Sequence, residues 1–564
     1  MVRASSSLYI LSSAALKRRA GRYFNRFPGL HCDLESYIYL PLLEKTGYIP
    51  SHKYAPGEEI RLHAKRIAEK WDLVDKTLFR SDVKSAVWND ATQLWTVRLI
   101  EGRGPAAQPI TREFQAQYVY LAAGVLTRPQ IPKIPGILSF GGSAFHTARW
   151  NYAISGGSPA KQELTLLKGK RVAVVGTAAT AVGVIPEVAK YAGELYVFQR
   201  TPAYVKPRKQ RKTIEAEFRS QVANASGWQR ERQLNFNSYQ TNSAKPGQRN
   251  LVGDGWTDIP AFSAIIGSPN HGIVDHSPEK LEEKDTRFHI LDLPHMEAIR
   301  SRVDGIIKDR DTAEKLKPWY PSWCKRPTFS DSYLDTFNRK NVHLIDTDGK
   351  GVTAATERGL VANGKEYPVD IIIFGTGFKS PAQGLGSPSV RTGIDVVGRH
   401  GQSLNRKWQE NGATTFHGYA TNGFPNFFFS AASQATQTGN NIFMLDIIAS
   451  HIIYIISEAE RRVGTGQRAI VEVTPEAEKA HTAEILKRAP FYSALRGCTP
   501  GYFNSYGEGA HITNPAEAAK RARAAAWSEG TASFLRYIGE WERKGSLDGL
   551  SVVPAGDGSL RARI

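Results

Sequence analysis

Cysteine is scarce in this chain of 564 residues, which contains only Cys32, Cys324 and Cys498. Their spacing matches no metal-binding motif, so the sequence predicts no zinc or other metal site. Three cysteines are also too few for a disulfide framework, and their scarcity indicates a reducing compartment. We therefore expect a cytoplasmic protein.

Acidic residues are outnumbered, with 54 Asp and Glu against 73 Lys and Arg, and the formal net charge at pH 7 is +19. The basic residues are scattered, with short clusters at 17–19, 206–212 and 520–523. No nucleic-acid-binding module accompanies them, so we expect no nucleic-acid partner. Part of the positive charge suits a protein that binds polyanionic dinucleotides.

Long uninterrupted apolar runs are absent as well. The longest apolar stretch, 442–456, contains Asp446, Ser450 and His451, and it suits a buried helix better than a membrane span. We therefore expect no membrane-spanning segment. A chain of this length, 41% hydrophobic, can form about two or three domains. The sequence carries no signal for an oligomeric state.

One segment has the pattern of a nucleotide-binding unit. Residues 168–202 read KGKRVAVVGTAATAVGVIPEVAKYAGELYVFQRTP, which predicts a strand at 172–175, a glycine turn, a helix and a second strand at 195–198. This is the βαβ order of a dinucleotide-binding fold, in which the helix N-terminus binds the pyrophosphate. Ala178 replaces the usual second glycine, and its methyl group is expected to weaken binding or displace the turn. The residues predicted to bind here are Gly176, Thr177, Ala178, Ala179, Thr180, Ala181 and Val182.

The end of the second predicted strand indicates which dinucleotide binds. Arg200 and Thr201 stand where an NAD-binding unit carries an acidic residue for the ribose hydroxyls. An arginine at this place favours a ribose 2′-phosphate, so we predict NADPH rather than NADH. The alternative is that Arg200 is one more solvated charge in a basic protein.

A motif precedes this unit by about twenty residues. The segment FGGSAFHTARW at 140–150 has the spacing Phe-x-Gly-x-x-x-His-x-x-x-Trp, formed by Phe140, Gly142, His146 and Trp150. It resembles the fingerprint of the Baeyer-Villiger class B flavin monooxygenases. Four further segments are similar to family motifs in the same order: NRFPGLHCDLESYIY at 25–39, CKRPTFSDSYLDTFNRKNVHLID at 324–346, DIIIFGTGF at 370–378 and GFPNFFF at 423–429. The alternative is that His146 and Trp150 serve linker packing and domain motion.

The resemblance runs from about residue 22 to the C-terminus and implies an activity. A Baeyer-Villiger enzyme uses FAD, NADPH and O2 to insert one oxygen next to a ketone, giving an ester or lactone, often in secondary metabolism. By resemblance, Arg326 and Asp33 are catalytic, since a fixed guanidinium stabilises the anionic oxygenating species. Further residues are implied to contact cofactors: Tyr23, Phe24, Asp33 and Tyr39 the flavin, His31, Cys32 and Asp33 the nicotinamide cofactor, and Lys325 the NADP phosphate. Alternatively, Asp33 only caps a turn and Arg326 only pairs with a surface carboxylate.

The family's N-terminal Gly-x-Gly-x-x-Gly turn, which binds the ADP half of FAD, is missing, because no glycine precedes Gly21. We therefore expect an α/β protein with two Rossmann-like dinucleotide-binding domains, the NADP domain being inserted in an N-terminally truncated FAD domain. We expect residues 1–150 to form the first part of the FAD domain and residues 331–564 to form its second part and the C-terminal segment. The NADP domain is expected at 151–330, with a helical excursion around 228–256. The missing turn leaves three alternatives open: an incomplete gene product, weak FAD binding, or a non-catalytic NADP-binding descendant. The Arg- and Ser-rich start of the chain also resembles a mitochondrial presequence. A further alternative for the activity is oxygenation of nitrogen or sulfur by the same flavin.

Overall fold

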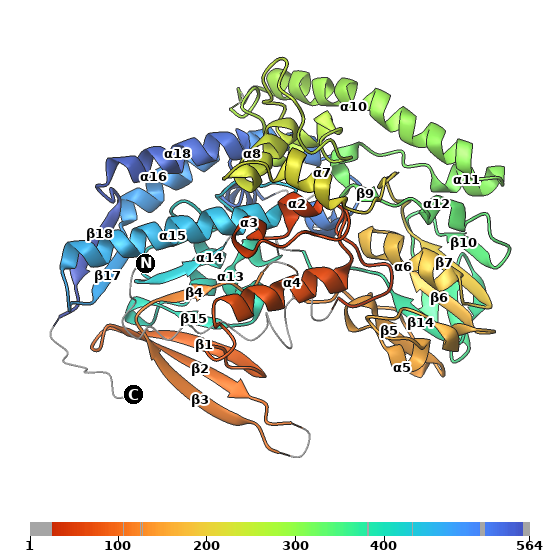
Figure 1. Cartoon of the computed structure of the whole chain (residues 1–564), viewed down its shortest axis with the longest axis horizontal. Helices are drawn as coiled ribbons and strands as arrows, with labels where there is room; N and C mark the ends of the chain where they lie inside the picture. Colours follow the sequence, from red (N-terminus) through yellow and green to blue (C-terminus); the bar gives the residue numbers. More distant parts are fainter. Residues whose placement is uncertain are drawn as a thin grey trace.

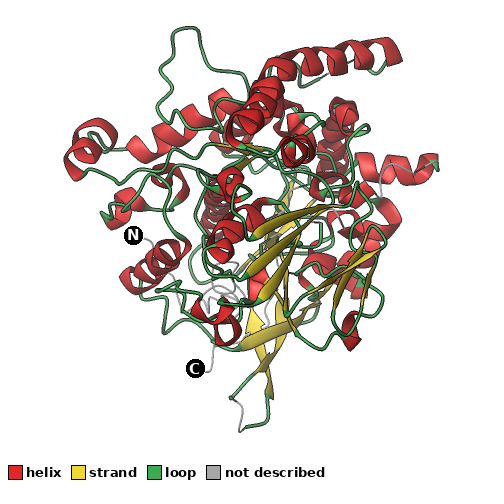
Figure 2. Cartoon of the chain, turned by 90° about the vertical axis from the view of Figure 1, so that its right-hand side faces the viewer, coloured by secondary structure: helices red, strands yellow, loops and turns green. Residues whose placement is uncertain are grey.

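The computed structural model describes residues 25–556 except 105–106, 125, 127, 274, 381–382, 431–432, 508–511 and 513. Tyr23, Phe24 and the segment that would carry the first glycine turn therefore lie outside the described residues. Helices are most numerous on the upper side of the molecule, and the strands of one sheet extend from its lower side (Figures 1 and 2).

A five-stranded parallel sheet forms the nucleotide-binding unit (right of Figure 1). Its strands, in spatial order, are β10 (Val342–Asp346), β7 (Glu194–Gln199), β6 (Arg171–Val175), β14 (Ile371–Phe374) and β5 (Ser143–His146). The predicted strand–turn–helix–strand order is confirmed, because β6 leads into helix α6 (Ala179–Ala189) and then β7. The α/β fold class predicted from the sequence is thus correct.

Different elements cover the two faces of this sheet. Successive side chains along β6 point to opposite faces, so they pack against different neighbours. Val172 and Val174 pack with α6 and α12 (Tyr333–Thr336). Ala173 and Val175 pack instead against a small antiparallel sheet of β11 (Ala354–Ala355), β12 (Gly359–Ala362) and β13 (Lys365–Pro368). Burial on both faces explains why β6 reads as a continuous apolar run.

The sheet draws strands from beyond both ends of the segment 151–330 that we expect to form the NADP domain. Strand β5 precedes the segment, whereas β10 and β14 follow it. The division of the chain into domains stays a prediction.

A helical region covers the top of the molecule in Figure 1 and includes the excursion expected around 228–256. Its helices are α8 (Trp228–Gln240), α9 (Ser263–Ile266), α10 (Pro278–Ile306) and α11 (Arg310–Leu316). Its aromatic core, with Phe236, Trp256, Trp323 and Phe329, also buries Leu34 and Ile38 from the N-terminal part of the described chain. This core joins segments nearly 300 residues apart in sequence.

One sheet of long strands forms the lower part of Figure 1, and a pair of strands lies at its left. Strands β1 (Ser81–Asn89), β2 (Leu94–Glu101), β3 (Ile110–Ala116) and β15 (Asp395–Val397) make one sheet, β4 (Val119–Leu121) pairs in parallel with β16 (Phe427–Phe429), and β17 (Ala469–Val473) pairs with β18 (Leu550–Pro554). The other elements are α2 (Ser36–Tyr39), α3 (Leu43–Thr46), α4 (Gly57–Lys70), α5 (Tyr152–Ser155), β8 (Val205–Lys206), α7 (Glu215–Glu217), β9 (Thr328–Phe329), α13 (Pro388–Thr392), α14 (Leu404–Asn411), α15 (Asn441–Val463), α16 (Pro475–Leu486), α17 (Pro515–Ala522) and α18 (Gly530–Lys544).

Helix α15 contains the longest apolar stretch of the sequence. By length and composition it is the one helix among the described residues that could cross a membrane. Its residues Phe443, Ile447 and Ile455 are buried in a core shared with α18 and β17, whereas Ile453 is exposed. One face of the helix thus packs as the sequence predicts for a buried helix.

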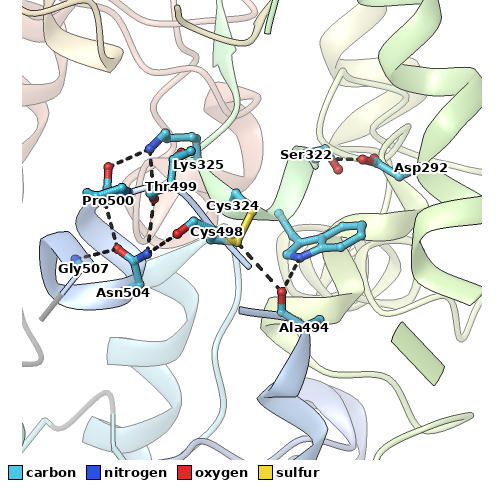
Figure 3. Close-up of a disulfide and its surroundings, with 12 residues drawn as sticks. Asp292, Ser322, Cys324, Lys325, Ala494, Cys498, Thr499, Pro500, Asn504 and Gly507 are labelled. Carbon is cyan, nitrogen blue, oxygen red and sulfur yellow. Dashed lines mark hydrogen bonds between the residues drawn. A yellow bond between two sulfur atoms is a disulfide. The ribbon is translucent and has the colours of Figure 1, made fainter. Parts of the chain in front are cut away.

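One disulfide is present, although the three cysteines predicted no disulfide framework and a reducing compartment. Cys324 and Cys498 form a bridge between segments 174 residues apart, with their Cα atoms 5.2 Å apart (Figure 3). The wide sequence separation hid the pairing, since only the tertiary fold brings the two residues together.

Candidate active site

The two residues predicted to be catalytic form an ion pair. Arg326 lies between a 3-10 turn, η7 (Ser322–Cys324), and β9, and Asp33 lies just before α2. The Arg326 guanidinium donates from Nη1 to Asp33 Oδ2 at 2.5 Å and from Nη2 to Oδ1 at 3.0 Å. Its side chain is nevertheless 38% exposed. The bidentate contact fixes the orientation of the guanidinium plane, while part of the side chain remains exposed.

The electrostatics of this pair hold both groups charged. Burial raises the pKa of the Asp33 carboxyl, but the charge and hydrogen bonds of Arg326, with the charge of Arg208, outweigh it and lower that pKa below its usual value. Burial likewise lowers the pKa of Arg326, and Asp33 more than restores it, so the guanidinium pKa is raised. A cation is therefore fixed here at any physiological pH.

Two residues that the sequence did not single out complete the surroundings of the pair. The Trp256 ring lies 5.2 Å from the Arg326 guanidinium carbon, in cation–π range. Arg208 donates from Nη2 to the Phe329 carbonyl at 2.8 Å. The sequence shows Trp256 only as part of an aromatic stretch and Arg208 only as part of a basic cluster. Neither pattern indicates that Trp256 contacts Arg326 or that the charge of Arg208 acts on Asp33.

The residues before α2 bring the predicted nicotinamide and flavin contacts beside this pair. Cys32 is buried and donates its N–H to the Ala55 carbonyl at 2.9 Å, which fixes the backbone next to Asp33. The His31 ring lies 3.1 Å from the Gly29 carbonyl, and burial together with the charge of Arg208 lowers its pKa. Tyr39, at the end of α2, lies near enough to Arg326 to act on its pKa.

The predicted pyrophosphate turn has the backbone that such a turn needs. Gly176 has φ +108, and a Cβ there would lie 2.8 Å from the Gly375 carbonyl oxygen, so only glycine fits. Helix α6 begins at Ala179 with no side-chain cap, which leaves its first amide groups for a ligand. Ala181 is fully buried and would contact a side chain at position 375. Thr177 donates to the Thr201 carbonyl at 2.8 Å, which ties the turn to the end of β7.

Two cations meet beside this turn. Lys325 Nζ and Arg200 Nη2 both donate to the Pro500 carbonyl, at 2.7 and 3.3 Å. Burial, with the charge of Arg200 adding to it, lowers the pKa of Lys325 to about 8. Across the described ranges, neither cation forms an ion pair with a carboxylate. Two converging cations that share one neutral acceptor suit a phosphate dianion, as predicted for the 2′-phosphate of NADP.

The four fingerprint residues flank β5: Phe140 and Gly142 precede the strand, His146 is its last residue and Trp150 follows it. The Phe140 ring packs over Gly142, where an added Cβ would lie 2.5 Å from the ring and 2.4 Å from the Asp370 carbonyl. Trp150 packs edge-on against Phe145 and donates to Ser155 Oγ at 2.9 Å. The sequence alternative of linker packing thus describes the contacts of these residues well.

His146 is the fingerprint residue with a titratable side chain. Its Nδ1 accepts the Ala148 N–H at 3.0 Å, and burial lowers its pKa to about 4. The imidazole is therefore neutral at physiological pH. It lies at the end of β5, beside Phe378, whose ring centroid is 6.1 Å away.

No protein-family model matches the chain. A polycyclic ketone monooxygenase from Thermothelomyces thermophilus is 55% identical over 531 residues, covering 94% of this chain and 81% of the relative. The FAD-binding monooxygenase prhK from Penicillium brasilianum is 42% identical over 536 residues, again covering 94% and 81%.

Solved structures agree with these relatives. The polycyclic ketone monooxygenase from Thermothelomyces thermophila superposes with a TM-score of 0.93, covering 96% of this chain and 84% of that one. A closed structure of cyclohexanone monooxygenase, at 24% identity, shares the fold with a TM-score of 0.72 and covers 96% and 93%. With relatives at 55% and 42% identity over nearly its whole length, the chain belongs to the Baeyer-Villiger type of FAD-binding monooxygenases.

Proposed function

We propose that this protein is an NADPH- and O2-dependent monooxygenase that inserts one oxygen next to a ketone to give an ester or lactone. The observation that carries the proposal is the Arg326–Asp33 pair, a fixed and partly exposed cation. The name of the relative at 55% identity favours a polycyclic ketone as substrate. A role in secondary metabolism fits this substrate class.

Bound FAD, once reduced by NADPH, supplies the chemistry that activates oxygen. Arg326 stabilises the negative charge that develops during oxygen transfer, because its guanidinium is already oriented and needs no rearrangement at that moment. Asp33 orients the guanidinium through two hydrogen bonds and keeps it protonated. We propose that Arg326 is the catalytic residue and that Asp33 acts beside it.

The described residues offer a site for the phosphates of NADP, and for FAD they offer contacts to the flavin end only. For NADP we propose the turn from Gly176 to Val182 for the pyrophosphate, and Arg200, Thr201 and Lys325 for the 2′-phosphate. The uncapped start of α6 and the two converging cations support this. For FAD we propose that the flavin end lies beside Asp33 and Tyr39, both of which act on Arg326.

We propose further that His31 and Cys32 border the nicotinamide, and that Tyr23 and Phe24, outside the described residues, contact the flavin. The fingerprint residues would act through packing at the start of the NADP unit. A cytoplasmic location remains part of the proposal, although the Cys324–Cys498 bridge removes the cysteine argument for it.

The absorption spectrum of the purified chain with added FAD, before and after NADPH is supplied without oxygen, tests this proposal. We expect a bound flavin band that bleaches with NADPH. Protein that stays colourless while binding NADPH would select the non-catalytic alternative. Bleaching followed by turnover of amines or sulfides, but of no ketone, would select heteroatom oxygenation.

A further inference from the structure

The Cys324–Cys498 bridge lies beside Lys325, one of the two cations proposed to bind the NADP phosphate (Figure 3). Cys324 precedes Lys325 in the chain, and Cys498 precedes Pro500 by two residues. Both sulfur-bearing residues are buried, at 3% and 9% exposure. The bridge therefore joins the donor side of the Lys325–Pro500 contact to its acceptor side.

The carbonyl of Pro500 is the acceptor that Lys325 and Arg200 share. Lys325 Nζ donates to it at 2.7 Å and to the Thr499 carbonyl at 3.3 Å, and Arg200 Nη2 donates to Pro500 at 3.3 Å. These carbonyls hold the two cations close together although each repels the other. The position of this short segment thus determines where the cations point.

The segment after Cys498 is stiffened by one side chain. Asn504 donates from Nδ2 to the Cys498 carbonyl at 2.9 Å and accepts the N–H groups of Gly501 at 2.8 Å and Gly507 at 3.2 Å (Figure 3). The segment is thus a compact unit rather than a loose loop. What this unit needs is a fixed attachment to the segment between η7 and β9, which carries Lys325.

The bridge provides that attachment. Along the backbone, Lys325 and Pro500 are 175 residues apart. Through the disulfide, the path from Lys325 to Pro500 passes only through Cys324, Cys498 and Thr499. A short covalent path lowers the entropy cost of keeping donor and acceptor together, which is how preorganisation raises affinity.

We propose that Cys324 and Cys498 are positioning residues for NADPH, and that their bridge determines the preference for NADPH over NADH. By holding the Pro500 carbonyl against Lys325 and Arg200, the bridge keeps both cations aimed at the 2′-phosphate, which NADH lacks. This inference rests on the proposed NADP site. It adds a covalent element to that site.

The test compares the wild-type chain, purified with FAD, with the double variant Cys324→Ala/Cys498→Ala. Isothermal titration calorimetry measures the dissociation constants of NADP⁺ and NAD⁺ for each protein. We expect the constant for NADP⁺ to rise about tenfold in the variant, as for a weakened charge-assisted contact, and that for NAD⁺ to change less than about twofold. The single variant Cys498→Ala opens the same bridge and should shift the ratio equally if the double variant does not fold.

Ser493→Ala is the matched control. Ser493 is buried on η10 (Ala489–Leu495), where its Oγ accepts from Lys284 at 2.9 Å and donates to Asp285 at 2.9 Å, so the variant loosens the same region away from the cations. We expect an unchanged ratio of the two dissociation constants. An equal loss of NADP⁺ and NAD⁺ affinity in the bridge variants, or the same ratio shift in Ser493→Ala, would overturn the inference.

Thiol titration of the unfolded wild-type chain without reductant supplies a second readout. One thiol per chain, that of Cys32, is expected from three cysteines and one bridge. Three thiols per chain would also overturn the inference. Wild-type protein that binds NAD⁺ as tightly as NADP⁺ contradicts the proposed function itself, so the two failures are distinguishable.

Discussion

Arg326 is held at two nitrogen atoms by Asp33, yet 38% of its side chain stays exposed. In the Arg326→Ala variant we expect reduction of FAD by NADPH within a few-fold of wild type and ester formation reduced by at least ~100-fold, since the cation acts after oxygen is activated. Stopped-flow flavin spectra and product chromatography measure the two steps. Normal ester yield would remove Arg326 from the mechanism. Arg326→Lys, which keeps the charge without the bidentate geometry, should recover part of the yield.

Lys325 gives the proposed NADPH site a pH dependence. Its pKa is lowered to about 8, by burial first and then by Arg200, so the ammonium is present below about pH 8 and is lost above it. We expect the NADP⁺ dissociation constant to rise by up to about tenfold per pH unit above pH 8, because binding then requires proton uptake. The constant for NAD⁺, which has no 2′-phosphate, should stay flat. Parallel curves for both dinucleotides from pH 7 to 9.5 would exclude this role of Lys325.

Arg200 tests the same site without a change of pH. Arg200→Ala should raise the Michaelis constant for NADPH about tenfold and that for NADH by less than about twofold, since the guanidinium donates towards the phosphate position. Steady-state kinetics with both cofactors give the answer. An unchanged preference would mean that Arg200 is only a solvated charge.

The sequence predicted site roles for Asp33, Arg326, Lys325 and Arg200, because family motifs and the βαβ pattern are local signals. It missed Trp256 and the Cys324–Cys498 bridge. Trp256 contacts Arg326 across 70 positions, and the two cysteines meet across 174. Such contacts depend on how the helical region folds over the sheet, and no local pattern encodes them.

At the scale of elements, the packing around β5 requires a glycine at position 142, because the neighbouring residues leave no space for a side chain. A methyl group there would lie 2.4 Å from the Asp370 carbonyl, which already accepts the Ser143 N–H, and 2.5 Å from the Phe140 ring. We expect Gly142→Ala to lower the free energy of unfolding by about 1–3 kcal/mol. Urea unfolding measures the change.

Gly305 on α10 is the matched control, because nothing lies within 4 Å of its added Cβ and its backbone is helical. Gly305→Ala should be neutral or stabilise the protein by up to about 1 kcal/mol. Equal destabilisation by the two substitutions would show that the close packing at Gly142 does not exclude a methyl group.

Strands β6 and β7 were predictable because an apolar run, a glycine and a second apolar run stand within 30 residues. Their sheet partners were not. Strands β5, β14 and β10 come from 143–146, 371–374 and 342–346, and each pairs across a wide sequence separation. When both faces of a sheet are buried, the sequence of a short strand is uniformly apolar and does not indicate which strand it pairs with. The expected NADP domain at 151–330 therefore leaves out β5, β10 and β14.

At the scale of the whole molecule, buried histidines make the free energy of unfolding depend on pH in the acidic range. His417 lies in the core of α15, α16 and α18, 3.2 Å from His451, with its Nε2 unpartnered among the described residues. Burial lowers the pKa of His417 well below its usual value, and burial lowers that of His481 to about 4. Both are therefore neutral when folded and take up protons on unfolding below about pH 6.5.

The free energy of unfolding should therefore fall as the pH decreases from about 6.5 towards 4, by about 1.4 kcal/mol per pH unit for each such histidine. The nearby groups are Glu542, which pairs with His451, and Arg488, which adds to the shift of His481. The substitution His417→Phe should reduce this pH dependence by the contribution of one histidine, about 1.4 kcal/mol per pH unit. Urea midpoints at pH 7 and pH 5 test it, and an identical slope in the variant would contradict the assignment.

The measurement that tests the central claim most directly is the mass of the product formed from a polycyclic ketone with FAD, NADPH and oxygen-18 gas. The account predicts an ester or lactone that carries one oxygen-18 atom, formed at the expense of one NADPH. Consumption of NADPH with no labelled product, or unchanged ketone without NADPH consumption, would contradict it.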